Sequence, residues 1–232
     1  MEAISERTPR PLRWAVLQQS WLDLAFLHWE VDPERVARLL PAGTWPDLFE
    51  GRAYAGLVPF RVGRTGPGFG VPYFGAFAET NVRLYTVDDE GRRGVTFRSM
   101  EASRLLPVVI ARMSLRLPYV WASMRLHRDR DIVRYSSQRR IGGVRSEAAV
   151  RVGERTERPS ELEHFLTARW GMHVPWFGRT IYVPNEHPPW PLHRAELLRC
   201  DDELLSAAGF EVRGEPSSVL FSPGVAVRFG LA

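Results

Sequence analysis

One short segment contains the side chains with the clearest chemical potential. The alternation of residues from Phe77 to Tyr85 predicts a β-strand, in which every second side chain lies on the same face. That face would carry Phe77, Glu79, Asn81, Arg83 and Tyr85. If it points into the protein, a carboxylate, an amide and a guanidinium converge on one ligand and supply an acid/base group with an anion clamp. If it points outward, the same residues form an ordinary solvated strand face.

Three residues outside this strand join the candidates. Arg98 lies on the strand expected to pair with it, and could complete a carboxylate clamp or simply neutralise Glu79. His28 could act as a base near neutral pH, whereas a lone histidine beside Trp29 on an apolar strand can also be purely structural. We group Trp29 with the ligand-binding candidates.

The basic residues limit the chemistry. The 232-residue chain has no lysine, so all 31 basic residues are arginine and no reaction can run through a lysine amine. The arginines are scattered among 27 acidic residues, and the net charge is only +4. Nucleic-acid binding needs a concentrated basic stripe and is not expected. No apolar stretch is long enough for a membrane span, so no membrane partner is expected either.

Metal and cysteine chemistry also lack support. Cys200 is the only cysteine, which excludes an internal disulfide and a cysteine metal cage, and we expect an ordinary buried thiol. His187 and His193 lie six residues apart around prolines, which is not metal-ligand spacing. No nucleophile elbow, Walker loop or zinc-protease motif occurs. We expect no metal and no cofactor.

Strands and short helices must position the candidate residues. Asp23–Val31 alternates as a strand, and Asp32 with Pro33 begins a short amphipathic helix. Further strands are expected over residues 51–60, 94–100, 180–183 and 224–229, with an antiparallel meander over 121–152. Further helices are expected from a capping box at 160–163 and over residues 202–209.

Two other segments carry specific expectations. A helix that starts at Ser103 and runs to Leu115 is apolar over most of its circumference, which predicts that it is well buried. The Gly/Pro-rich loop from Gly63 to Gly75 is long enough to be a lid over a binding site, or it is merely mobile surface.

Together these elements predict an α+β fold, in which an antiparallel sheet curls into a β-barrel or cone and a few helices pack on it. No repeat and no linker divides the chain, so we expect one domain over residues 1–232, with residues 1–12 as a flexible tail. The N-terminal residues do not resemble an export signal, and we expect a cytoplasmic protein.

Several short segments occur in a specific order along nearly the whole chain. They are 26–29, 40–43, 47–51, 59–60, 79–83, 117–119, 187–192 and 222–225. This series resembles the YqjF-like family of unknown function, which belongs to the acetoacetate decarboxylase-like superfamily. The Trp-Pro-Leu run at 190–192 is its most distinctive part, and we interpret it as a rigid plug at one end of the barrel. The resemblance implies a β-cone with an interior pocket.

The resemblance transfers the pocket but not the decarboxylase reaction. Decarboxylases of this superfamily carry a Pro-Lys-Lys run in which one lysine forms an imine with the keto acid. Here the corresponding run is Pro118-Tyr119-Val120, so both amines are missing. The resemblance places Glu79 at the position of a pocket glutamate and Tyr119 at that of the imine-forming lysine. Tyr119 could donate a proton or hydrogen bond to a bound carbonyl, or be a core tyrosine with a satisfied hydroxyl.

Three functions stay open at this point. The first is a small-molecule pocket protein, which is a lysine-independent enzyme on a carboxylate- or carbonyl-bearing metabolite if Glu79 and Tyr119 face each other across the cavity. The second is a non-catalytic module that binds or senses a metabolite. The third is a scaffold whose exposed aromatic side chains serve self-association. The expected partner is a small-molecule ligand, and a homo-oligomer stays open.

Overall fold

The structure is a computed structural model that describes residues 1–66 and 76–231. Most of the loop considered as a lid, residues 67–75, lies outside the described residues. The strands are β1 Leu17–Val31, β2 Thr44–Pro46, β3 Ala53–Gly66, β4 Phe77–Asp88, β5 Arg93–Ala102, β6 Tyr119–Asp129, β7 Ile132–Arg139, β8 Arg145–Arg155, β9 Gly171–Trp176, β10 Arg179–Glu186, β11 His193–Asp202 and β12 Ser218–Phe229. The helices are α1 Pro33–Leu39, α2 Leu105–Ser114, α3 Glu161–Thr167 and α4 Leu204–Ala207.

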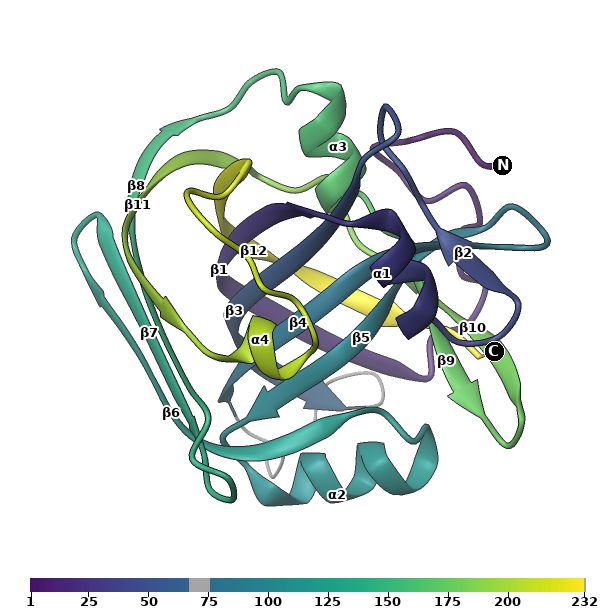
Figure 1. The fold of residues 1–232 in the computed structure, drawn as a ribbon, viewed down its shortest axis with the longest axis horizontal. Coiled ribbons are helices and arrows are strands. Elements are labelled where there is room, and N and C mark those ends of the chain that lie inside the picture. Colours follow the sequence, from purple (N-terminus) through teal and green to yellow (C-terminus); the bar gives the residue numbers. More distant parts are fainter. Residues whose placement is uncertain (67–75, 232) are drawn as a thin grey trace.

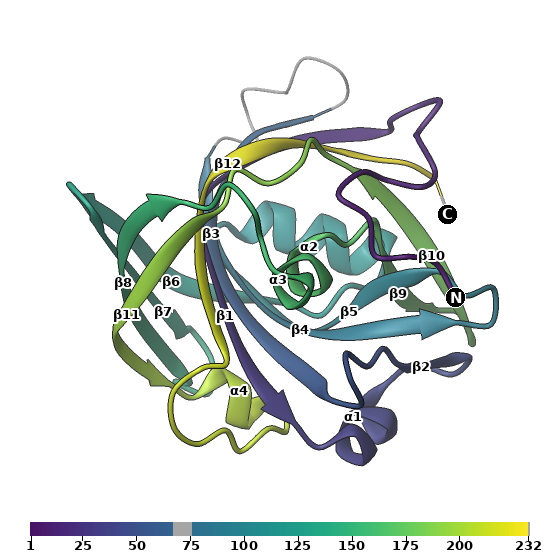
Figure 2. The same cartoon turned by 90° about the horizontal axis from the view of Figure 1, so that it is seen from above.

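All the strands belong to one 12-stranded sheet, in the order β10-β9-β5-β6-β7-β8-β11-β12-β1-β3-β4-β2. Most neighbours run antiparallel, as predicted, but β5 runs parallel to both β6 and β9. β10 also pairs with β12, and β4 with β5, so strands far apart in this order are joined. The sheet curls around an interior, with α3 at one end and α2 at the other (Figure 1 and Figure 2).

The long strands have a buried core on each face. In β1, Leu24 and Phe26 belong to the core on the inner face, whereas Ala25 and Leu27 belong to the core beneath α4. This division follows from the alternation of side chains along a strand. Polar side chains on the inner face are therefore removed from water, which costs free energy unless they find hydrogen-bond partners.

Local signals in the sequence correctly placed the ends of several elements. The side chain of Asp32 accepts a hydrogen bond from the backbone N–H of Glu34 at 2.9 Å and caps α1. Ser160 and Glu163 form the predicted capping box of α3. Gly209, with a φ of 104°, follows α4 in the left-handed conformation that glycine tolerates.

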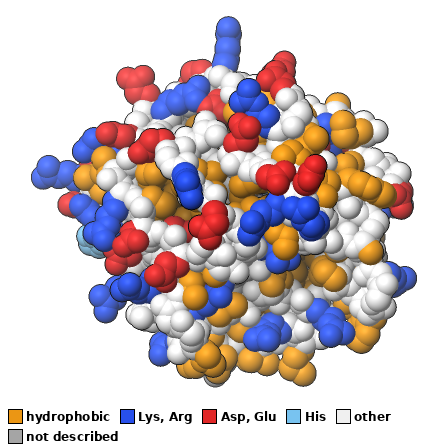
Figure 3. Space-filling model, viewed as in Figure 1, with side chains coloured by type: hydrophobic (Ala, Val, Ile, Leu, Met, Phe, Trp, Pro, Cys, Tyr) orange, Lys and Arg blue, Asp and Glu red, His pale blue; other side chains and the backbone are white. Residues whose placement is uncertain are grey.

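The predicted burial of the apolar helix is wrong. Only Val108 is buried in α2, whereas Leu106 is 45% and Met113 is 80% exposed. The helix begins two residues later than expected, because the Ser103 hydroxyl accepts from the backbone N–H of Ala78 and does not cap it. Hydrophobic side chains are visible at the lower edge of the molecule, where α2 lies (Figure 3). No helix in the described ranges is both long and apolar enough to cross a membrane.

Residues 1–12, expected as a flexible tail, are held against the sheet. The backbone N–H of Glu2 donates to the carbonyl of Gly91 at 2.8 Å, and that of Leu12 donates to the Glu186 carboxylate at 2.9 Å. Between them, Arg10 donates to the Tyr182 hydroxyl at 2.8 Å. These partners lie far from residues 1–12 in the sequence, so the local pattern could not reveal them.

Candidate functional site

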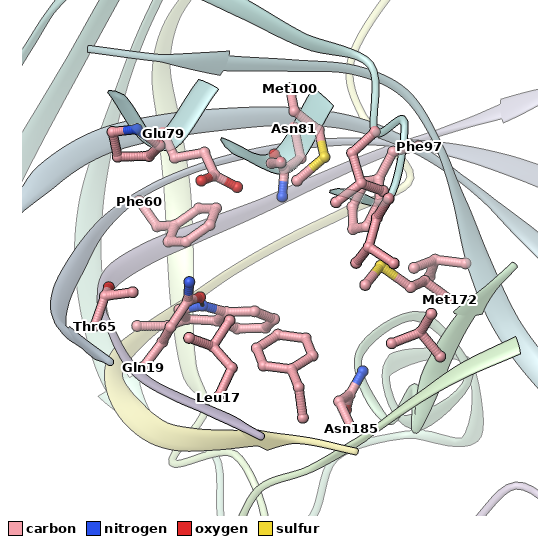
Figure 4. A pocket seen from close by; sticks show the side chains of 18 of the residues that line it. Leu17, Gln19, Phe60, Thr65, Glu79, Asn81, Phe97, Met100, Met172 and Asn185 are labelled. Atoms are coloured by element: carbon pink, nitrogen blue, oxygen red, sulfur yellow. Dashed lines mark hydrogen bonds between the residues drawn. The ribbon is translucent and has the colours of Figure 1, made fainter. Parts of the chain in front are cut away.

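A cavity of about 360 Å³ lies inside the curled sheet, lined by residues of α2 and by the end of α3. Glu79 and Asn81 project into it from one wall, and Asn185 from the opposite wall (Figure 4). Most lining side chains are apolar and include Leu24, Val58, Phe60, Phe77, Met100 and Phe229. A mostly apolar cavity with a few convergent polar groups is typical of a small-molecule site.

The alternating face of β4 points into this cavity. Phe77, Glu79, Asn81 and Arg83 all line it, and Tyr85 lies beyond them, 1% exposed. Of the two orientations that the sequence left open, the protein adopts the inward one. The strand can do so because its other face is also covered, by the core beneath α4.

Glu79 and Tyr119 form a buried pair at the cavity wall. The Tyr119 hydroxyl donates a hydrogen bond to Oε2 of Glu79 at 2.9 Å. Burial raises the pKa of Glu79 to about 8, although hydrogen bonds from Tyr119 and Asn81 oppose the shift. Burial and the neighbouring Glu79 also raise the pKa of Tyr119 well above its ordinary value. The pair therefore holds its protons at neutral pH, with the carboxyl close to its titration range.

Backbone pairing brings Tyr119 to Glu79. Asn81 of β4 is paired with Met100 of β5, and Met100 is paired with Tyr119 of β6. The second pairing is parallel, because α2 and the residues after it carry the chain back so that β6 starts beside the last three residues of β5. Tyr119 thus starts in the same row as Asn81, and its ring reaches two residues along β4 to the carboxyl of Glu79.

Arg83 places a cation in the cavity wall. Its Nε donates to the Tyr85 hydroxyl at 3.1 Å, and its Nη2 donates to the carbonyl of Leu166 at 2.9 Å. Arg169 also lines the cavity, but it forms an ion pair with the buried carboxylate of Asp47. Among the described residues no carboxylate pairs with Arg83 in this way. Arg83 is therefore the cation that is available to a ligand carboxylate.

His28 lies behind this cation and does not line the cavity. Its Nε2 is 2.5 Å from the hydroxyl of Tyr85, which donates to the carbonyl of Leu166 at 2.9 Å. Because that hydroxyl has one proton, Nε2–H of His28 is the donor in their contact. The Nδ1 atom is then a bare acceptor, and it has no partner within the described chain. Burial, followed by the charges of Arg83 and Arg169, holds the pKa of His28 well below its ordinary value, so the ring is neutral.

Two other candidates lie away from the cavity. Trp29 is on the outer face of β1, in the core beneath α4. Arg98 donates to the carbonyl of Leu39 at 3.2 Å, on the side of the sheet that carries α1. A bulge in the pairing of β4 with β5 sets Arg83 opposite Phe97, so Phe97 lines the cavity and Arg98 does not. Neither Trp29 nor Arg98 is placed to touch a ligand there.

The opposite wall adds residues that the sequence did not single out as ligand contacts. His187 lines the cavity, and burial lowers its pKa to about 4, so its ring is neutral near pH 7. Trp190 stacks on Trp21 with ring centroids 6.2 Å apart and donates from Nε1 to the carbonyl of Thr167 at 3.0 Å. The prolines around Trp190 could have indicated a rigid wall. They could not have indicated which strands it would face.

The single cysteine, Cys200, lies at the surface of the protein. Cys200 is exposed on β11, so its predicted burial is wrong. It does not line the cavity. Within residues 1–66 and 76–231, no three His, Cys, Asp or Glu side chains are grouped to hold a metal ion.

Comparisons with known proteins agree with this architecture. The family model DUF2071, described as an uncharacterized conserved protein, matches residues 18–226. The uncharacterized protein YqjF of Bacillus subtilis (strain 168) is 30% identical over 189 residues, which cover 78% of this chain and 76% of that protein.

Solved structures show the same fold at low sequence identity. The enduracididine biosynthesis enzyme MppR complexed with pyruvate is 18% identical, with a TM-score of 0.60 over 95% of this chain and 89% of that chain. Acetoacetate decarboxylase from Legionella pneumophila is 15% identical, with a TM-score of 0.61 over 95% of this chain and 90% of that chain. The resemblance read from the sequence is thus confirmed, and the chain belongs to the YqjF-like DUF2071 family, with a fold like that of acetoacetate decarboxylase.

Proposed function

We propose that this protein binds a small carboxylate that also bears a carbonyl, and that it moves a proton at the carbon next to that carbonyl without using a lysine. The observation that carries the proposal is the buried hydrogen bond between Tyr119 and Glu79 at the cavity wall, 2.9 Å long. A perturbed carboxyl in a cavity, next to a second titratable group, is the usual mark of acid/base chemistry.

Glu79 supplies the acid/base group. General acid/base catalysis works best when the pKa of the group lies near the working pH, and the pKa of Glu79 is about 8. The ionised fraction takes a proton from the carbon next to the carbonyl, and the electron pair moves onto the carbonyl oxygen. Tyr119 turns its hydroxyl from Glu79 to that oxygen and stabilises the enolate by a hydrogen bond. Reprotonation by Glu79 completes the cycle.

Arg83 and Asn81 anchor the ligand. The guanidinium of Arg83 donates hydrogen bonds to the ligand carboxylate, since Arg83 has no carboxylate partner among the described residues. The Oδ1 atom of Asn81 is buried and lacks a hydrogen-bond donor in the described chain, so it suits a hydroxyl or N–H of the ligand. Four residues along β4 separate Glu79 from Arg83, a Cα separation of roughly 13 Å in an extended strand. Several carbon atoms can therefore lie between the two ends of the ligand.

The absence of lysine limits which reactions this site can catalyse. Without an amine there is no imine, and hence no covalent electron sink for decarboxylation of a β-keto acid. Proton transfer next to a carbonyl needs only a base and a hydrogen-bond donor, and Glu79 and Tyr119 can supply both. The pyruvate in the MppR complex supports a carbonyl-bearing carboxylate as the ligand class, since that protein shares the fold.

We also infer that the strands close into a cone around the cavity and that the chain forms one domain. The additional pairings of β10 with β12 and of β4 with β5 support this closure. A closed wall keeps water from the acid/base pair and strengthens its interactions with the ligand.

Binding without turnover is the second candidate function. It is favoured by the fixed shape of the cavity wall at the end of α3, where Trp190 and Arg83 each donate a hydrogen bond to a backbone carbonyl. A sensor of a metabolite needs that shape and no proton transfer.

Two measurements separate these functions. A thermal-shift screen with keto acids, hydroxy acids and apolar carboxylates identifies ligands, and NMR in D₂O then follows loss of the proton next to the ligand carbonyl. We expect exchange with the wild type and a loss of at least about 10²-fold in Glu79→Gln and Tyr119→Phe. Tyr135→Phe is the matched control, because the Tyr135 hydroxyl donates to the carbonyl of Asp23 and lies outside the cavity.

The outcomes are distinct. A thermal shift without exchange above buffer supports binding without turnover and contradicts the enzyme. No shift with any acid, in a protein that unfolds cooperatively, contradicts the carboxylate pocket itself.

A further inference from the structure

Helix α2 and its neighbours present an apolar surface that no described residue covers. Leu105, Val109 and Met113 of α2 are 48%, 40% and 80% exposed. They line one groove together with Trp121 of β6 and Ile141 of the β7–β8 turn, and Ile141 is 89% exposed. We name these five residues the α2 surface. A contiguous exposed apolar patch of this kind marks an interaction site.

A further exposed apolar side chain lies past the C-terminal end of the helix. Phe177, in the turn between β9 and β10, is 73% exposed. Its neighbour Trp176 donates from Nε1 to the carbonyl of Ser114 at 3.3 Å, which ties this turn to α2. The guanidinium of Arg116 lies over the ring of Phe177, 5.2 Å from its centroid. An aromatic side chain and an arginine therefore stand at this end, as Trp121 and Arg140 do at the other, 4.4 Å apart.

The segment of the chain that contains this surface is strongly basic. Residues 102–146 contain ten arginines and only two acids, Asp129 and Asp131. The net charge of this segment is therefore +8, compared with +4 for the whole chain. The rest of the chain is therefore net negative, although the overall charge is modest. The lower edge of the molecule, over α2, shows hydrophobic and basic side chains and no acidic ones (Figure 3).

The arginines at the α2 surface are free to meet an external charge. Arg112 and Arg140 line the same groove as the apolar residues. Of the ion pairs among the described residues, none involves Arg112, Arg116 or Arg140, whereas Arg139 next to them pairs with Glu101. Long arginine side chains beside an apolar strip can lie along it and project their charge to its rim.

We propose that the α2 surface docks on a bilayer that contains anionic phospholipid. Exposed aliphatic and aromatic side chains with a rim of arginines match the acyl and headgroup layers of such a membrane. In a symmetric contact between two copies of the chain, the same arginines would face one another without acids to compensate them. Nucleic acid would meet the arginines but leave Leu105, Val109 and Met113 against a charged backbone, which apolar side chains do not favour.

Helix α2 lies between the proposed docking surface and the cavity. The opposite side of the helix lines the cavity through Pro107, Ala111 and Leu115. A docked bilayer would thus lie one helix away from the proposed ligand site. The docking itself does not depend on the proposed reaction, because it rests on the outer surface alone.

Vesicle flotation tests the proposal with the full chain. The probes are phosphatidylcholine vesicles and vesicles of phosphatidylcholine mixed with phosphatidylglycerol, each at low and high salt. We expect flotation with the anionic vesicles only, weakened by salt. The triple variant Arg112→Gln, Arg116→Gln, Arg140→Gln should weaken binding on the order of 100-fold, from about five-fold per arginine.

Further variants separate the apolar and charged contributions. Met113→Glu with Ile141→Glu should abolish flotation, and both positions are exposed enough to keep the fold. Arg35→Gln with Arg38→Gln on α1 removes two other exposed arginines and should leave binding unchanged. Sedimentation of the protein without lipid, and a titration with duplex DNA, complete the test.

Three results would overturn the inference. The first is equal flotation with neutral and anionic vesicles, or none with either. The second is self-association that Met113→Glu abolishes in a protein that binds no vesicle, which would assign the surface to a second copy. The third is tight, salt-dependent binding of DNA without binding of vesicles.

Discussion

The hydroxyl of Tyr119 lies 2.9 Å from Oε2 of Glu79 and donates a hydrogen bond to it across the pairings of β4, β5 and β6. Glu79 is 3% exposed and Tyr119 is 9% exposed, yet both line the cavity. No arginine of the described chain pairs with this carboxyl. Its stable form is therefore the protonated one, which accounts for a pKa of about 8.

Removing the carboxyl should change how stability depends on pH. The pKa of Glu79 is about 8 when folded and lies near the ordinary value of 4.5 when unfolded. Between these values the folded state holds more protons, so rising pH destabilises the wild type by about 1.4 kcal/mol per unit. Glu79→Gln lacks this loss, so its stability relative to the wild type should rise by a few kcal/mol from about pH 5 to pH 9. Urea unfolding at both pH values checks this, and parallel pH profiles would contradict it.

Removing the phenol should raise the pKa of Glu79 further. The hydrogen bond from Tyr119 lowers that pKa, so Tyr119→Phe removes a stabiliser of the carboxylate. We expect the carboxyl of the variant to titrate above pH 8. ¹³C NMR of labelled glutamate measures this titration, and the signal missing from Glu79→Gln assigns the resonance. The same variant should lose about 1 kcal/mol of stability at neutral pH. An unchanged titration midpoint would show that the contact is absent in solution.

Arg83 should control anion binding, and Arg98 should not. Arg83→Met removes the cation that lines the cavity, whereas Arg98→Met removes one that contacts the carbonyl of Leu39 outside it. A carboxylate ligand at about 100 times its dissociation constant stabilises the fold by about 2.7 kcal/mol. That stabilisation should vanish in Arg83→Met and persist in Arg98→Met, measured by thermal shift. Loss in both variants would point to a general effect of charge.

A single methyl group on Gly56 should disturb the support of Arg83. A Cβ at Gly56 would lie 3.0 Å from the ring of His28 and 3.3 Å from Cγ of Arg83. The ring of His28 is buried and hydrogen-bonded to the hydroxyl of Tyr85, so it has little room to move. We expect Gly56→Ala to lose about 1–3 kcal/mol of stability and to weaken carboxylate binding.

Gly63→Ala on the same strand is the control for that variant. Its added methyl meets Cδ1 of Leu22 at 3.2 Å, the end of a flexible side chain that can turn aside. Denaturant unfolding of the two variants makes the comparison. Equal stability of both would mean that His28 and Arg83 are not tightly packed around Gly56.

Much of the local structure could be predicted from neighbouring residues. Asp32 and Ser160 mark the starts of α1 and α3, because capping joins atoms only a few residues apart. The alternation in β4 correctly grouped Glu79, Asn81 and Arg83 on one face. Strand β9 and most of β11 gave no such signal, since their side chains do not alternate cleanly between apolar and polar.

Errors arose where packing partners decide the outcome. The apolar circumference of α2 predicted burial, but one side of the helix lines the cavity, most of the rest is exposed, and Val108 alone is buried. Arg98 was expected beside Glu79, but a bulge between β4 and β5 shifts the register so that Arg98 does not face the cavity. Residues 1–12 carry no strong pattern, and their hydrogen bonds go to distant strands.

The sequence by itself determined that no imine can form, because it contains no lysine, and that Glu79 and Arg83 share one face of a strand, because side chains alternate. Only the tertiary structure decided that this face lines a cavity and that Tyr119 meets Glu79 there. The meeting depends on the parallel pairing of β5 with β6 across α2. Pairing of that kind is set by the packing of the whole sheet, which no pattern of neighbouring residues encodes.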